Sequence, residues 1–104
     1  MNRVKVGVVG LGQRGLQHLK ALWQLADAEV VALCDPTTDN LKEEKIKKFV
    51  PDYQQGSIGL YTCFDNLLNQ GRLDAIYFCI PPSLHKGELI RAADAGIHLF
   101  VEKP

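Results

Sequence analysis

The feature that most constrains the fold of this 104-residue chain is a short apolar run leading into three spaced glycines. Val4–Val9 is rich in valine and almost continuously apolar, which is typical of a strand buried within a parallel sheet. The motif Gly10-x-Gly12-x-x-Gly15 follows, and residues 16–23 then carry apolar side chains at helical spacing. We therefore predict a strand, a glycine turn and a helix in direct succession.

Each glycine of this motif has a separate role in such a turn. Gly10 permits the tight bend, Gly12 lets a pyrophosphate approach the backbone, and Gly15 allows the helix to pack closely on the strand. The phosphates would accept hydrogen bonds from backbone N–H groups at Gln13 and Arg14, at the positive end of the helix. A glycine-rich turn without a ligand is the alternative, but the flanking strand and helix favour a dinucleotide site.

A second candidate cofactor ligand is Asp35, which directly follows the predicted strand 29–34 and lies twenty residues after Gly15. In a dinucleotide-binding fold, a carboxylate at this point accepts hydrogen bonds from the hydroxyls of the adenosine ribose. It would also repel a 2′-phosphate, and residues 36–40 contain no arginine. We therefore predict NAD rather than NADP. The alternative is that Asp35 is a turn or cap residue before Pro36.

Strands and helices alternate along the rest of the chain. We expect helices at 41–49, 65–70 and 84–95, and strands at 60–63, 73–80 and 97–101. This alternation predicts an α/β fold, a Rossmann-type doubly wound parallel sheet of about five strands with helices on both faces.

The polar and glycine positions of interest follow the carboxyl ends of these strands, where such sheets bind ligands. They are Gly10 to Gly12, Asp35, Ile80 to Pro82, and Glu102 with Lys103. Their convergence on one edge of the sheet supports a single cofactor site.

Composition excludes several classes of partner. Lys plus Arg and Asp plus Glu both number 12, so nothing indicates a nucleic-acid or membrane-surface footprint. Cys34, Cys63 and Cys79 form no C-x-x-C motif and lie in or beside apolar runs, which indicates buried thiols in a reducing compartment. We expect a cytoplasmic protein without a metal site or a membrane segment.

The segments 79–85 and 96–104, the second ending in Glu-Lys-Pro, resemble the glucose–fructose oxidoreductase, inositol dehydrogenase and MocA-type (Gfo/Idh/MocA) oxidoreductases. The resemblance is to the nucleotide-binding half of that family and extends over essentially the whole chain. It implies hydride transfer between NAD(P) and a secondary alcohol of a sugar, an inositol or a related polyol.

The same resemblance implies roles for individual residues. Lys103 is the active-site lysine and Glu102 helps to hold the nicotinamide ribose. Ile80 and Pro81 lie along the cofactor, and His85 opens the helix beside it. Without the resemblance, Lys103 would be interpreted as a surface lysine and His85 as an ordinary residue of a first helical turn. An ammonium beside the reacting hydroxyl would stabilise developing alkoxide charge.

Complete members of the family continue with another helix and strand and with a second domain that supplies substrate contacts and a catalytic Asp and His. We therefore expect residues 1–104 to be an NAD(P)-binding domain that lacks this last strand and the C-terminal domain. It would bind cofactor, would be inactive alone, and would meet a polyol or sugar substrate only with that domain. A stand-alone NAD-binding sensor or remnant without catalysis is the alternative. The edge strand 97–101 also predicts self-association.

Overall fold

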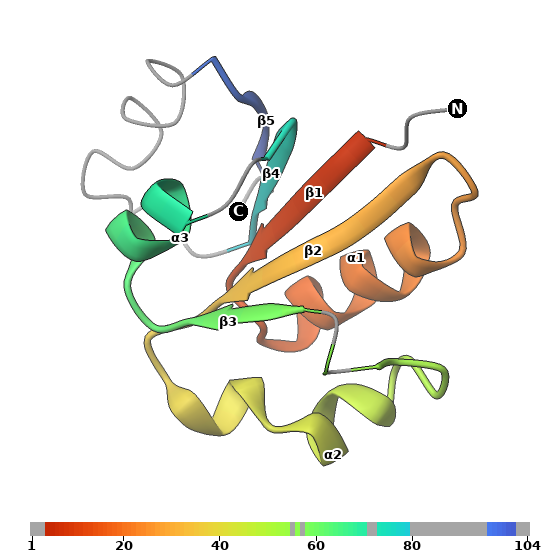
Figure 1. Cartoon of the computed structure of the whole chain (residues 1–104). Helices are drawn as coiled ribbons and strands as arrows, with labels where there is room; N and C mark the ends of the chain where they lie inside the picture. Colours follow the sequence, from red (N-terminus) through yellow and green to blue (C-terminus); the bar gives the residue numbers. More distant parts are fainter. Residues whose placement is uncertain (1–3, 55, 57, 71–72, 80–95, 102–104) are drawn as a thin grey trace.

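The computed structural model describes residues 4–54, 56, 58–70, 73–79 and 96–101. Its strands form one sheet in the order β3-β2-β1-β4-β5 (Figure 1). All of the strand pairs in this sheet are parallel. The Rossmann-type prediction is thus confirmed, with β1 at the centre. In chain order the elements are β1 (Val4–Val9), α1 (Gln13–Trp23), β2 (Ala28–Cys34), the 3-10 helix η1 (Thr38–Leu41), α2 (Glu43–Lys47), β3 (Gly59–Tyr61), α3 (Phe64–Gln70), β4 (Ala75–Phe78) and β5 (His98–Val101).

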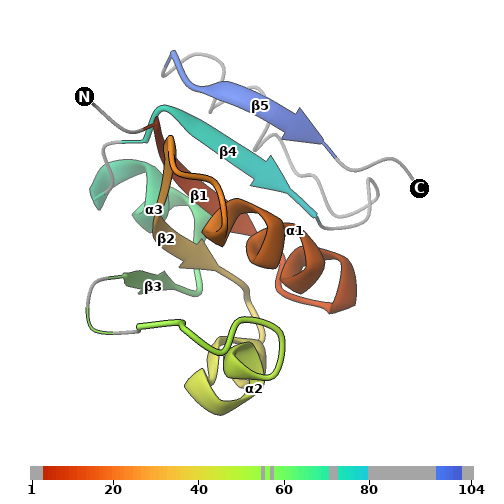
Figure 2. The ribbon, with the colours of Figure 1, turned by 90° about the vertical axis from the view of Figure 1, so that its right-hand side faces the viewer.

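Helices cover both faces of the sheet, with α1 on one side and α3 on the other (Figure 2). Val6 and Val8 of β1 belong to the same apolar core as Leu16 and Leu19 of α1, whereas Val9 belongs to the core on the α3 side. The nearly continuous apolar character of β1 therefore reflects burial on both faces from Val6 onward, as the sequence indicated. This packing fixes the amino end of α1 over the carboxyl end of β1, where the glycine turn lies.

The helix predicted at 41–49 is wrong in its bounds. The chain instead forms η1, then an extended residue at Lys42 (φ −67°, ψ 133°), and then the short α2. The break allows both Leu41 and Ile46 to enter the core on the α1 side, where they are 7% and 0% exposed. One continuous helix would impose helical spacing on these two residues, so tertiary packing determines the local structure here.

Smaller differences concern strand ends and one thiol. β4 is shorter than the strand predicted at 73–80, and β3 begins and ends earlier than predicted. Cys34 is buried and Cys79 is half-buried, but Cys63 is exposed, so the expectation of three buried thiols is wrong for Cys63. Cys63 follows β3 in the connection to α3, where the apolar neighbours in the sequence do not enclose it. The helix predicted at 84–95 lies outside the described residues.

β5 forms one edge of the sheet in the described part of the chain (Figure 2). Its Phe100 is 49% exposed and stacks on Tyr77 of β4, with ring centroids 4.6 Å apart. Among the described residues, no helix is both long enough and apolar enough to cross a membrane.

Candidate functional site

The glycine turn lies between the carboxyl ends of β2 and β4. Gly10 N–H donates a hydrogen bond to the carbonyl of Cys34 at the end of β2, at 2.8 Å. Cys79 N–H, just after β4, donates to the carbonyl of Val9, also at 2.8 Å. Gly10 has a φ of 92°, a conformation that residues with a side chain rarely adopt. The turn is thus fixed at the edge of the sheet where α/β proteins bind ligands.

Gly15 is required because α1 packs directly on this turn. A Cβ at position 15 would lie 1.8 Å from the carbonyl oxygen of Gly10 and 2.8 Å from its carbonyl carbon. No side-chain movement could relieve that overlap, since both atoms belong to the backbone. The predicted role of Gly15 in close helix packing is therefore explained by contact with the turn itself.

Gly12, unlike Gly15, has open space beside it, and this space is the feature that fits a phosphate group. A Cβ at this position would meet no atom within 4 Å. Gly12 is the N-cap of α1 and, being glycine, supplies no side-chain cap, and the first turn of the helix contains no acidic residue. The positive end of the helix dipole thus lies at the exposed residues Gly12, Gln13 and Arg14. Open space beside helix N–H groups is suitable for a pyrophosphate.

Asp35 is buried, at 5% exposure, and lies directly against the glycine turn. Its Oδ2 accepts hydrogen bonds from Leu11 N–H at 2.7 Å and from Asn40 Nδ2 at 3.1 Å, and its Oδ1 accepts from Thr37 N–H at 2.8 Å. The bond to Leu11 connects the end of β2 to the middle of the G-x-G segment. Asp35 therefore stabilises the turn whether or not a ribose is bound.

Counting only donors from the described residues, the carboxylate of Asp35 has capacity for one further donor. An ionised carboxylate offers about four acceptor positions, and two are occupied on Oδ2 but only one on Oδ1. Of the two oxygens, Oδ1 thus accepts from fewer donors within the described residues. The bond from Thr37 N–H, two residues on, is an Asx turn, so the structural alternative for Asp35 also describes part of its environment.

Sequence reasoning missed two residues around Asp35, namely Asn40 and Lys45. Asn40 Nδ2 donates to Asp35, and Lys45 Nζ donates to Asn40 Oδ1. A signal existed for the Asx turn, because Asp-Pro-Thr is a typical turn sequence. None existed for Asn40 or Lys45, since their contacts depend on how η1 and α2 pack.

The structure brings Gly10, Gly12, Gly15 and Asp35 together, with the exposed Gln13 and Arg14 at the start of α1. The other predicted site residues, Ile80, Pro81, His85, Glu102 and Lys103, lie outside the described residues.

These features define a dinucleotide-binding Rossmann domain: a parallel sheet, a glycine turn at its carboxyl edge, an open helix N-terminus and an acidic residue after β2. The sequence profile of the Gfo/Idh/MocA oxidoreductase family, NAD-binding Rossmann fold, matches residues 4–104. The chain belongs to this family and is its NAD-binding domain. The resemblance carried by the Glu-Lys-Pro segment is thus confirmed.

Similar proteins include both dehydrogenases and a glycosyl hydrolase. The chain is 33% identical over its full length to a glycosyl hydrolase family 109 protein of Shewanella pealeana, covering 23% of that protein. A dehydrogenase from Chromobacterium violaceum superposes with a TM-score of 0.81 at 32% identity, covering 100% of this chain and 29% of the other. Scyllo-inositol dehydrogenase from Lactobacillus casei, with bound NAD(H) and scyllo-inositol, superposes with a TM-score of 0.78 at 26% identity. The match covers 99% of this chain and 28% of the dehydrogenase. The chain thus spans about a quarter of the length of these relatives.

Proposed function

We propose that this chain binds NAD in preference to NADP, as the cofactor-binding part of an enzyme that oxidises a secondary alcohol of a sugar, an inositol or a related polyol. The observation that carries the proposal is the open space beside Gly12 at the uncapped start of α1. Asp35, hydrogen-bonded to Leu11 in the same turn, would hold the adenosine ribose through Oδ1. Its negative charge would oppose a 2′-phosphate at that place.

The remaining roles follow from membership of the family. NAD, when bound, would supply the hydride acceptor. Glu102 would help to hold the nicotinamide ribose, Ile80 and Pro81 would lie along the cofactor, and His85 would open the helix beside it. Lys103 would place its ammonium near the reacting hydroxyl, where it stabilises developing negative charge.

Substrate class is supported by relatives and not by a pocket of this chain. Scyllo-inositol is present in one similar structure, which favours a polyol. In the family, the substrate is held mainly by a second domain, so we infer that this chain alone binds cofactor without turnover. An NAD-binding module with no catalytic role is the alternative. It predicts the same binding but no activity in any longer form of the protein.

A second candidate activity is hydrolysis of a glycosidic bond, favoured by the 33% identity to the glycosyl hydrolase family 109 protein. Incubating the longest expressed form of the protein with NAD and either inositols or chromogenic glycosides separates the two activities. NADH formation would support the dehydrogenase, and release of the chromophore without net NADH would support the glycosidase.

Calorimetric titration of the chain with NAD and with NADP tests the proposed binding. Saturable NAD binding should be at least about tenfold tighter than NADP binding, corresponding to about 1.4 kcal/mol. Asp35→Ala should weaken NAD binding and narrow the difference between the affinities for NAD and NADP. Asp52→Ala removes an exposed carboxylate elsewhere and should change neither affinity. Equal affinities for NAD and NADP in the natural sequence would exclude the proposed role of Asp35, and absence of NAD binding would exclude the function.

A further inference from the structure

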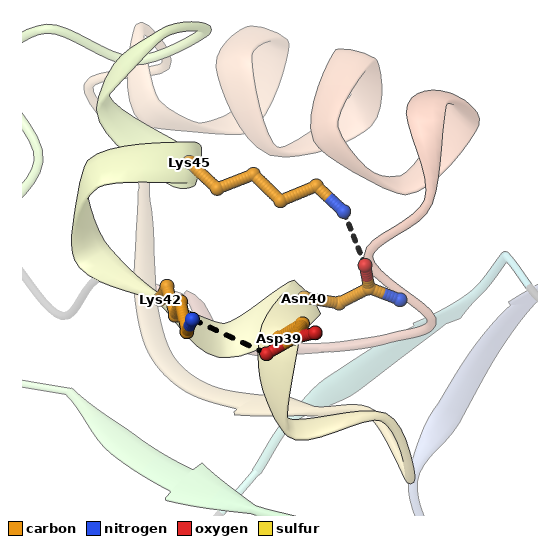
Figure 3. A network of polar contacts seen from close by, with 4 residues as sticks. All are labelled: Asp39, Asn40, Lys42 and Lys45. Atoms are coloured by element: carbon orange, nitrogen blue, oxygen red, sulfur yellow. Dashed lines mark hydrogen bonds and ion pairs between the residues drawn. The ribbon is translucent and has the colours of Figure 1, made fainter.

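Lys45 is a cation separated from Asp35 by a single amide group. Its Nζ donates a hydrogen bond to Oδ1 of Asn40, as Figure 3 shows, and Nδ2 of the same amide donates to Oδ2 of Asp35 at 3.1 Å. The three side chains come from α2, from η1 and from the end of β2. They form a chain of hydrogen bonds that leads from a lysine to the carboxylate on the glycine turn.

Asn40 is held in this position from both sides. Its amide is engaged at both ends, its backbone N–H donates to the carbonyl of Thr37 at 3.0 Å, and the residue is half-buried. The other lysine in Figure 3, Lys42, forms an ion pair with Asp39 at 3.3 Å, and both side chains are well exposed. Of these two lysines, Lys45 is the one whose contacts lead to Asp35.

We propose that Asn40 is a positioning residue that determines cofactor specificity, because it holds Lys45 away from Asp35 and holds Asp35 on the glycine turn. This inference rests on the proposed function, namely NAD binding at that turn. A neutral amide passes a hydrogen bond to Oδ2 without neutralising the charge of the carboxylate. Oδ1 stays oriented for a ribose hydroxyl, and the uncompensated charge opposes a 2′-phosphate.

Direct contact between Lys45 and Asp35 would have the opposite effect. A lysine ammonium on its flexible stem pairs readily with a carboxylate or with a phosphate. Without the amide of Asn40, Lys45 becomes free either to neutralise Asp35 or to pair with a 2′-phosphate directly. Both events favour NADP relative to NAD.

The test measures dissociation constants for NAD and NADP in the natural chain and in Asn40→Ala, Lys45→Met and the double variant. Asn40→Ala should raise the dissociation constant for NAD about tenfold, the usual effect of losing a hydrogen bond to a charged group. It should also narrow the preference for NAD over NADP by about tenfold. Adding Lys45→Met should restore most of that preference, because the cation responsible is then absent. Lys42→Met is the matched control and should leave both constants within about twofold.

If Asn40 had a purely structural role, Asn40→Ala would weaken the binding of NAD and of NADP by the same factor. That result would overturn the inference. A double variant that keeps the narrowed preference would also overturn it. If Asn40→Ala does not fold, as judged by its circular dichroism, Asn40→Ser takes its place and the same two outcomes decide. Lys45→Met alone should leave the preference for NAD over NADP within about twofold, because Asn40 already keeps Lys45 away from Asp35. Failure of the natural chain to bind NAD would refute the proposed function instead.

Discussion

Replacing Gly15 with alanine should destabilise this domain strongly, because the new methyl group would collide with backbone. The Cβ would lie 1.8 Å from the oxygen of Gly10, whereas ordinary contacts begin at 3.4 Å. The turn and α1 would have to separate by more than an ångström. Gly10 is not free to move, since its N–H is bonded to the carbonyl of Cys34 at 2.8 Å.

The size of the effect follows from overpacking in a rigid place. Overpacked sites usually lose about 1–3 kcal/mol, occasionally more, and two backbone segments in contact favour the upper end of that range. A domain of this size has a total stability of about 5–15 kcal/mol. Each kcal/mol corresponds to about 4 °C or more in melting temperature. Gly15→Ala should therefore melt at least about 12 °C below the natural chain.

Gly12→Ala is the matched control, since it adds the same methyl group where no atom lies within 4 Å. The backbone at Gly12 (φ −70°, ψ −169°) is accessible to alanine. Alanine restricts the unfolded chain, which stabilises the fold by about 0.4–1 kcal/mol, but it is a poorer N-cap residue than glycine, so stability should change by less than about 1 kcal/mol. The same variant should lose NAD affinity, because its Cβ would enter the space proposed for the pyrophosphate. Melting followed by circular dichroism measures the stability of both variants. Gly15→Ala melting within about 2 °C of the natural chain would refute this packing argument, given the scale above.

Three further changes give distinct outcomes. Asp35→Ala leaves the N–H of the fully buried Leu11 without its acceptor and should lower the free energy of unfolding by about 1–3 kcal/mol in urea titrations. Burial, with a contribution from Glu43, raises the pKa of Tyr53 to about 12. The unfolded chain therefore loses this proton first, and stability should fall by about 1.4 kcal/mol per pH unit between about pH 10 and 12. Tyr53→Phe should remove that part of the slope. Phe100→Lys places a charge on the edge strand β5 and should reduce any self-association seen by sedimentation. A natural chain that stays monomeric at high concentration would contradict the proposed edge pairing.

The centre of the fold could be predicted because its signals are local. Val4–Val9 is apolar apart from Lys5, and the spacing of Gly10, Gly12 and Gly15 after it is typical of a strand, a turn and a helix in succession. The alternation of strands and helices then restricts the sheet to a parallel one with right-handed crossovers. The order β3-β2-β1-β4-β5 follows from those constraints together with the resemblance to the family.

The environment of Asp35 could be predicted only in part. Its place after β2 and its distance from Gly15 are visible in the sequence, but its bond to Leu11 joins residues 24 positions apart. Asn40 and Lys45 were missed because the break between η1 and α2 positions them, and that break depends on burying Leu41 and Ile46. Contacts set by packing leave no pattern in the local sequence.

The central claim is that the glycine turn of this chain binds a dinucleotide, and an NMR titration of the isotope-labelled chain with NAD tests it most directly. If NAD binds at the turn, saturable shifts of backbone amide signals should be largest at Leu11, Gly12, Gln13 and Arg14, and NADP at the same concentration should cause smaller shifts. Amides of β3 and of the loop around Asp52 should not respond. Shifts centred away from the turn, or no shifts at millimolar NAD, would contradict the account.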